Sequence, residues 1–288
     1  QPNTLFPYTT LFRSYYAALD RVGAGGGPDW NTDNDIYWGE TNEADYLPEV
    51  AVGRICADQT NEFQAALNKQ RMYQYSPVNG DLKKAIMVGE NLNEDPVTWG
   101  GTYKDEIRNG GTYNSYTTIG FPPGFTISTL YDRDTAPDWS WNDLKNSMNN
   151  GLNLINHLGH SNTNYNMKFV TSYVTNSNLT SNGTNHNYFI IYTQGCYPAA
   201  FDNRDSDENY SSEDCIAEAF TSISNGCVAF IGNSRYGWYN PGGTDSSSQY
   251  LDRQFFDALF GENIHNIGFT NNDSKIDENE KNNTHQAH

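Results

Sequence analysis

Short apolar runs alternate with amphipathic segments along most of the chain. Runs of four to eight apolar or aromatic residues bounded by turn residues are typical of buried strands. Such runs lie at Glu49–Cys56, Lys84–Gly89, Phe125–Tyr131, Gly151–Asn156, Tyr188–Thr193 and Cys227–Gly232. Apolar residues recur at helical spacing in Asn61–Tyr75, Asn142–Asn149, Ile216–Ile223 and Gln249–Gly261. Because strands that alternate with helices favour right-handed crossovers, the pattern predicts an α/β fold with a mainly parallel sheet.

The two ends of the chain depart from this pattern. Thr4–Ser14 matches the translation of a common sequencing adapter, so residues 1–14 are expected to be foreign and the chain a metagenomic fragment whose native part begins near Tyr15. Asn271–His288 has almost no apolar residues and is expected to be a polar linker or tail. The sequence therefore predicts one domain over residues 15–270, truncated on its N-terminal side.

The charge balance limits the possible partners. With 17 basic and 35 acidic residues the formal net charge is −18, so the phosphates of a nucleic acid would be repelled. No apolar run approaches the roughly 18 residues that a membrane helix needs. An acidic composition that is rich in Asn, Tyr and Trp and poor in Lys favours an extracellular or cell-surface bacterial protein. The 4 cysteines are too few for a disulfide scaffold.

Two residues suited to catalysis follow predicted strands. His160 lies just after the run that ends at Asn156, and Cys196 lies just after the run that ends at Thr193. The carboxyl ends of parallel strands meet at one edge of a sheet, where ligands bind. There an imidazole can favour the thiolate or protonate a leaving amine. Backbone N–H groups at Cys196 and in the turn after His160 could bind the oxyanion that develops.

A structural role for this pair is an equally good interpretation of the spacing alone. Cys196 would then be a buried structural thiol, and His160 would hydrogen-bond a carbonyl of its turn. His157, three residues before His160, could instead begin a metal site. No third nitrogen or sulfur ligand has suitable local spacing, which argues against zinc.

A second motif favours calcium. Asp29–Glu40 has the residue pattern of an EF-hand calcium loop, with candidate ligands Asp29, Asn31, Asp33, Asp35 and Glu40. Asn34 stands where that pattern has Gly, and Asn tolerates the left-handed conformation better than most residues. No flanking helices are evident, so we expect a structural Ca²⁺ loop within another fold. A solvated acidic loop is the alternative.

A third motif is an aromatic loop that follows the predicted strand Cys227–Gly232. This loop, Gly232–Gly243, contains Tyr236, Trp238 and Gly242. Aromatic side chains on a Gly-rich loop beside a catalytic edge could form the wall of a substrate pocket. They could equally well pack the loop onto the protein.

The motifs, taken together, resemble the gingipain family of cysteine peptidases. Beyond the Gly-His and Gly-Cys turns, the similar segments are Pro48–Ile55, Asp214–Ala219 and Asn233–Arg235 before Trp238, and the resemblance runs from about Tyr15 to Gly268. It implies a caspase-like three-layer α/β sandwich, peptide-bond hydrolysis, bound calcium and secretion by bacteria. It also implies an immunoglobulin-like domain after the catalytic one, absent from this sequence.

The resemblance also assigns roles to individual residues. It implies Cys196 as the nucleophile, His160 as the general acid/base and Glu90 as the acid that orients the histidine. Ser161 replaces the glycine that follows the family's histidine, but its backbone N–H, like that of Cys196, can still bind the oxyanion. Trp238 corresponds to a pocket wall.

The resemblance does not indicate which substrate residue this protein prefers. The acid that selects Arg or Lys in the best-known members has no clear counterpart near Trp99–Thr102, and a pocket methionine position is Gly242. Asp95 is a candidate substitute. Basic specificity is therefore not expected to transfer.

The sequence thus predicts a secreted cysteine endopeptidase that acts on proteins or peptides, without an organic cofactor. Two alternatives stay open. A catalytically inactive surface or secretion-associated relative would keep the fold, and a calcium-dependent binding module would explain the acidic, aromatic composition without Cys196.

Overall fold

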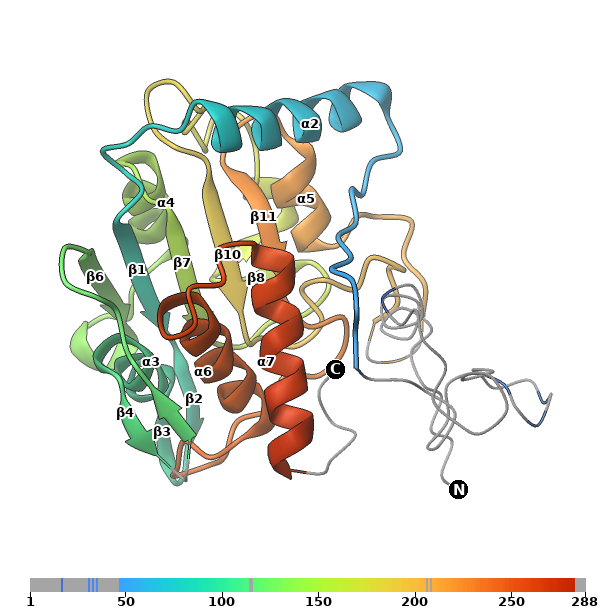
Figure 1. Ribbon diagram of the computed structural model, residues 1–288. Helices are drawn as coiled ribbons and strands as arrows, with labels where there is room; N and C mark the ends of the chain where they lie inside the picture. Colours follow the sequence, from blue (N-terminus) through green and yellow to red (C-terminus); the bar gives the residue numbers. More distant parts are fainter. Residues whose placement is uncertain are drawn as a thin grey trace. The chain divides into compact units, whose positions relative to one another are not determined.

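Five of the six predicted strands form in the computed structural model, which describes Ala17, Asn31, Asp33, Asp35 and residues 47–113, 116–205, 207 and 209–282. They are β1 (Lys84–Gly89), β6 (Thr126–Tyr131), β7 (Leu154–Leu158), β10 (Phe189–Thr193) and β11 (Cys227–Ile231). All pair in parallel, in the order β11-β10-β7-β1-β6 (Figure 1). The predicted α/β fold with a parallel sheet is therefore confirmed.

The chain divides into two compact units. The larger unit consists of residues 55–111 and 120–249 and contains the five-stranded sheet. The smaller unit consists of residues 1–54, 112–119 and 250–288. The sheet and all residues that follow its strands at the carboxyl edge belong to the larger unit.

Side chains alternate between the two faces of the sheet, and a helical layer covers each face. On one face Ile155, Ile191 and Val88 pack with α4 (Trp141–Asn149) and α5 (Ile216–Ser222) in the main hydrophobic core. On the other face α3 (Gly100–Asn109) lies against β1 and β7. Because successive residues of a strand point to opposite faces, Asn156 and Leu158 turn toward α3, where Tyr103 packs against Leu158.

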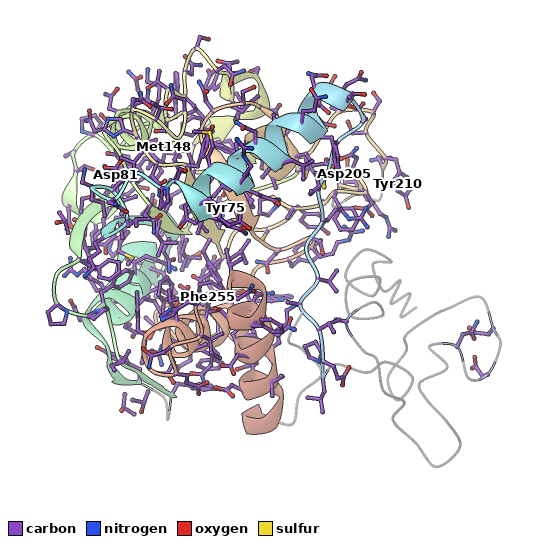
Figure 2. All side chains as sticks on the ribbon, turned by 45° about the horizontal axis from the view of Figure 1, so that its top comes forward. Tyr75, Asp81, Met148, Asp205, Tyr210 and Phe255 are labelled. Carbon is purple, nitrogen blue, oxygen red and sulfur yellow. The ribbon has the colours of Figure 1, made fainter. Side chains whose placement is uncertain are left out.

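Helix α2 (Thr60–Tyr75) lies beside α5 and β11 (Figure 1). The buried Lys69 donates from Nζ to the carbonyl of Thr221 at 2.7 Å, near the end of α5. Met148 of α4 lies within the core, whereas Tyr75 at the end of α2 is 79% exposed (Figure 2). The helix is therefore anchored by one face and exposed at its end.

Short elements complete the described part. In the larger unit β2 (Asn91–Glu94) pairs antiparallel with β3 (Val97–Trp99), and β8 (Tyr165–Asn166) with β9 (Phe169–Val170). The remaining elements are the 3₁₀ helices η1 (Asp132–Asp134) and η2 (Thr171–Tyr173), strands β4 (Gly111–Tyr113) and β5 (Tyr116–Thr118), and helices α6 (Ser247–Phe260) and α7 (Ile267–Asn282). Among the described residues, no helix is both long and apolar enough to cross a membrane.

The predictions for Glu49–Cys56 and for the C-terminal tail are wrong. Glu49–Cys56 pairs with no strand of the described residues, and most of its side chains are partly or fully exposed. The tail is helical as far as Asn282. Its buried face is polar rather than apolar: Tyr116 donates to the carboxylate of Glu278 at 3.1 Å, and Asn272 donates to the carbonyl of Val50 at 2.9 Å. The sequence of α7 therefore lacks the hydrophobic periodicity that indicates a helix, although the helix forms.

Helix α3 was not predicted from the sequence, because its first two residues are glycines. A Cβ on Gly101 would lie 2.7 Å from the ring of Tyr131, and one on Gly100 would lie 2.5 Å from the carbonyl oxygen of Leu158. A Cβ on Gly89 would lie 2.2 Å from the backbone nitrogen of Gly101. Glycine at these positions lets α3 approach β1 and β7 at backbone distance, next to the carboxyl edge of the sheet.

This close approach gives a test of the packing. Gly89→Ala should destabilise the protein by about 1–3 kcal/mol, because α3 must move away from β1 to admit a methyl group. Gly80→Ala is the matched control, since a Cβ there meets nothing within 4 Å. Urea unfolding of both variants measures the difference. Equal stabilities for the two variants would contradict this packing.

Candidate active site

The candidate catalytic residues lie at the carboxyl edge of three neighbouring strands. Glu90 follows β1, while His160 and Cys196 lie in the turns after β7 and β10. His157 and Thr193 are register partners in adjacent strands, and His160 and Cys196 each come three residues later. The two turns therefore leave the sheet at the same level.

The turns after β7 and β10 are in direct contact. A Cβ on Gly195 would lie 2.5 Å from the Cβ of Ser161 and 3.3 Å from the carbonyl oxygen of Gly159. Residue 195 precedes the cysteine, and residues 159 and 161 flank the histidine. The structure therefore places the turn that carries Cys196 against the turn that carries His160.

Glu90 contacts this region through both carboxylate oxygens. Oε1 lies 3.1 Å from Nε2 of His157, and Oε2 accepts a hydrogen bond from the backbone N–H of His160 at 3.2 Å. A Cβ on Gly159 would lie 2.3 Å from Cδ of Glu90, so only glycine fits between them. The carboxylate thus holds the backbone of His160, and within the described residues its imidazole partner is His157.

The ring of His160 has other neighbours. Its Nε2 lies 3.2 Å from the carbonyl oxygen of Leu92, and its edge meets the ring of Tyr239 with centroids 6.5 Å apart. A carbonyl can only accept, so Nε2 of His160 is the donor in this contact. Among the described residues Glu90 bonds the main chain of His160 and not its ring, and the ring contacts the carbonyl of Leu92; the orienting role of Glu90 therefore stays a prediction.

The Cys196 thiol is half-buried beside Gly237. Its Sγ lies 3.4 Å from both the backbone nitrogen and the carbonyl oxygen of Gly237. Burial raises the pKa of the Cys196 thiol, and the hydrogen bond with the Gly237 backbone opposes this rise only in part. The side chain is therefore a thiol rather than a thiolate at neutral pH in this state.

The turn that carries Cys196 is fixed by the aromatic loop. The side chain of Asn233 donates to the carbonyls of Gln194 and Gly195 at 3.2 and 3.0 Å. Tyr197 has a left-handed φ of 62° and donates from its backbone to the carbonyl of Arg235 at 2.7 Å. These contacts were not predicted from the sequence. The Asn233–Arg235 motif was the only available signal for them.

Two backbone donors are available beside these residues. Within the described residues, neither the amide N–H of Ser161 nor that of Cys196 has a hydrogen-bond acceptor. The side chain of Ser161 is turned to its own chain and donates to the carbonyl of Tyr165 at 2.8 Å. The two N–H groups expected to bind the oxyanion thus lie at this edge without an acceptor among the described residues.

The predicted pocket residues lie on the same loop. Trp238 and Tyr236 are 62% and 53% exposed, with ring centroids 6.0 Å apart, and Tyr236 meets Tyr197 edge to face. The backbone N–H of Trp238 donates to Oγ of Ser248 at 2.8 Å. The aromatic rings are thus exposed on a loop whose backbone is held.

Gly242 joins this loop to the β2–β3 hairpin. Its N–H donates to Oγ1 of Thr98 at 2.8 Å, and a Cβ on Gly242 would lie 3.0 Å from the ring of Pro96. Asp95 precedes Pro96 in the hairpin. The candidate Asp95 therefore belongs to the segment that contacts the predicted pocket loop.

Part of the predicted calcium loop lies within the described residues. Asn31 is 7% exposed and donates from Nδ2 to the carbonyl of Asp35 at 2.9 Å, while Asp33 accepts the N–H of Asp35 at 3.2 Å. Oδ1 of Asn31 is buried with no hydrogen-bond partner among the described residues. Asp29 and Glu40 lie outside the described residues. An orphaned buried oxygen fits the predicted oxygen-ligand chemistry.

The state of the thiol leads to a pH prediction. Because burial raises the pKa of Cys196, alkylation of this residue by iodoacetamide should be slow at pH 7 and should still accelerate above pH about 8.5, the ordinary value for a thiol. Site-resolved mass spectrometry across a pH series measures the rate. A rate that is already constant below pH 7 would show a preformed thiolate and contradict the described environment.

Comparisons with known proteins agree with this geometry. The sequence profile of peptidase family C25 matches residues 4–288. The match begins within residues 1–14, whose foreign origin remains a prediction. A search of curated protein sequences finds no significant match.

Solved structures show the same fold. The chain is similar to a structure of gingipain R, described as an Arg-specific cysteine proteinase, with TM-score 0.64 and 18% identity over 84% of this chain and 52% of the other. It is also similar to a complex of the pro- and mature domains of Porphyromonas gingivalis RgpB, with TM-score 0.62 and 18% identity over 82% and 52% of the two chains.

The chain thus spans about half the length of these structures. Their likeness confirms the predicted caspase-like arrangement of a parallel sheet between helices, and the profile match confirms the resemblance to gingipains, a family of cysteine-type peptidases. The chain belongs to peptidase family C25.

Proposed function

We propose that the protein is a cysteine endopeptidase in which Cys196 is the nucleophile and His160 the general acid/base. The contact between the turns after β7 and β10 carries this proposal, because it brings the thiol and the imidazole to one edge of the sheet. Family membership supports the reaction class. Glu90 contributes by holding the main chain of His160.

The raised pKa of Cys196 decides the order of the proton transfers. The thiol proton moves to Nδ1 of His160 as Sγ attacks the scissile carbonyl carbon. The oxyanion accepts hydrogen bonds from the backbone N–H groups of Ser161 and Cys196. The imidazolium then protonates the leaving amine as the C–N bond breaks. Water hydrolyses the resulting thioester, with His160 as the base, and restores the thiol.

The substrate class follows from the loop beside the thiol. Exposed Trp238 and Tyr236 offer apolar faces to a substrate side chain or to extended peptide backbone. Proteins and peptides are therefore the proposed substrates. The Arg preference stated for gingipain R is not transferred, and the preferred residue before the scissile bond is left open, with Asp95 as a candidate determinant.

Calcium is proposed as a structural ion of the loop around Asn31. A Ca²⁺ ion would give the buried Oδ1 of Asn31 the partner that the described residues do not provide. It would also neutralise the neighbouring carboxylates of a strongly acidic chain. Secretion, cell-surface location and a following immunoglobulin-like domain are further proposals that rest on the family resemblance.

The nucleophile has a direct test. Cys196→Ala should lower kcat/KM for labelled casein and peptide libraries by about three orders of magnitude or more. Cys56→Ser is the matched control, since Cys56 is also a half-buried cysteine but lies outside the site, and it should retain full activity. Proteolysis that persists in the Cys196 variant would contradict the mechanism. Inactivity of the unchanged protein would favour a non-catalytic relative.

The calcium proposal has a separate test. Added Ca²⁺ should raise the melting temperature of the protein, and Asn31→Ala should abolish that rise because it removes the buried oxygen. Asp138→Ala, which removes an exposed acid outside the loop, should leave the rise unchanged. Differential scanning fluorimetry with Mg²⁺ as the reference cation measures the shift. The same melting temperature with calcium as with chelator would exclude the site.

A further inference from the structure

His157 is a fully buried imidazole with a polar contact at each ring nitrogen. It is 0% exposed, lies within β7 and faces the same side of the sheet as Ile155. Its Nε2 lies 3.1 Å from Oε1 of Glu90, and its Nδ1 lies 2.8 Å from Oγ1 of Thr193. The ring therefore bridges the residue after β1 to the last residue of β10.

The neighbours of His157 determine its protonation. A carboxylate only accepts, so Nε2 must donate to Glu90, which leaves Nδ1 either as the acceptor of a neutral ring or as a second donor of an imidazolium. Burial lowers the pKa of His157, and the charges of Lys104 and Lys168 add to this effect against the opposing carboxylate of Glu90. Nδ1 of the ring meets the hydroxyl of Thr193, whose Oγ1 also donates to Oδ1 of Asn166 at 3.3 Å.

The chain of contacts continues past the ring in both directions. Oγ1 of Thr193 accepts the backbone N–H of Gly195 at 3.2 Å, immediately before Cys196. At the other end, Oε2 of Glu90 accepts the backbone N–H of His160 at 3.2 Å. His157 thus stands at the centre of a hydrogen-bonded path from the main chain of the histidine turn to that of the cysteine turn.

Strand pairing does not require this path. Main-chain hydrogen bonds join β7 to β10 as far as Gln194, whose N–H donates to the carbonyl of His157 at 3.0 Å. Beyond Gln194 the two turns leave the ladder of main-chain hydrogen bonds between β7 and β10. A buried histidine in a strand costs desolvation energy that an apolar ring of similar size would avoid. What the imidazole adds is two directed hydrogen bonds to groups that hold the turns.

We propose that His157 is a positioning residue of the peptidase: its imidazole, bridging Glu90 and Thr193, sets the separation and orientation of His160 and Cys196. The inference rests on the proposed function, because it assigns the two turns a shared reaction. It gives a use to the histidine that the sequence left ambiguous between a structural and a metal-binding role.

The test compares substitutions that keep or remove the two hydrogen bonds. His157→Gln can still donate to Glu90 and accept from Thr193 through one planar amide. His157→Phe keeps the ring volume and loses both bonds. Thr193→Val, with little change of volume, removes the hydroxyl that contacts His157, Gly195 and Asn166, and it keeps the contact of His157 with Glu90. His186→Phe is the matched control, because Nδ1 of His186 pairs with Asp81 at 3.1 Å, outside the turns that carry His160 and Cys196.

Three readouts are needed for each variant: kcat and KM for a cleaved peptide, the rate of Cys196 alkylation by iodoacetamide across pH, and the melting temperature. His157→Phe should lower kcat by about 10- to 100-fold with a much smaller change in KM, since misplacement of reacting groups by about 1 Å costs this much. Thr193→Val should lie between His157→Phe and the unchanged protein. His157→Gln should recover most of the lost kcat, and His186→Phe should match the unchanged protein.

The outcomes separate this inference from the function on which it rests. No cleavage by the unchanged protein contradicts the proposed function, whatever the variants do. Cleavage with equal kcat in His157→Phe and the unchanged protein overturns the inference alone. An equal loss of kcat in His157→Gln and His157→Phe also overturns the inference. An unaltered pH profile of Cys196 alkylation in His157→Phe does the same. If His157→Phe does not fold, Thr193→Val decides by the same criteria.

Discussion

The parallel pairing of β7 with β10 is the interaction on which the candidate site depends. It sets His157 opposite Thr193, and equal offsets of three residues then bring the turns of His160 and Cys196 into contact. β1 pairs on the other side of β7 and delivers Glu90 to the same edge. A shift of one residue in either pairing would turn the side chains of a strand to the opposite face of the sheet, and the residues of the candidate site would no longer lie together.

Backbone proximity at this edge is as important as side-chain chemistry. Gly89, Gly100, Gly159 and Gly195 all stand where a Cβ would meet another atom at less than 3.0 Å. These contacts let the sheet, α3 and both turns pack against one another without intervening side chains. Several polar groups at the edge then pair with one another, as Glu90 shows by contacting both a ring and a main-chain N–H. Such a network favours one arrangement because each missing partner would leave a buried polar group unpaired.

The sequence predicted the regular core well and the irregular connections poorly. Apolar runs such as Lys84–Gly89 and Tyr188–Thr193 form strands with almost the predicted bounds, because a strand that is buried on both faces has a continuous apolar sequence. Helix α7 was missed since its buried residues, Asn272 and Glu278, are polar and paired. Helix α3 was missed since glycine is a poor helix former, and only tertiary packing reveals why glycine is needed there.

The same division applies to the site. Cys196 and His160 could be proposed from the sequence because each follows a predicted strand. Their supports could not, since Asn233, Leu92 and Thr193 contribute through contacts between distant segments. Glu90 was proposed from the family resemblance, but its contacts with the His157 ring and the His160 main chain depend on the glycine at position 159, to which the sequence pattern assigned no role.

Cys196 and His160 are proposed to act as one reactive unit at the edge of the sheet. Labelling with a peptidyl chloromethyl ketone, followed by peptide mapping, tests this pairing. We expect an adduct on Cys196 and on none of Cys56, Cys215 and Cys227, and a large loss of that adduct in His160→Ala. Labelling spread over several cysteines, or labelling of Cys196 that His160→Ala leaves unchanged, would contradict it.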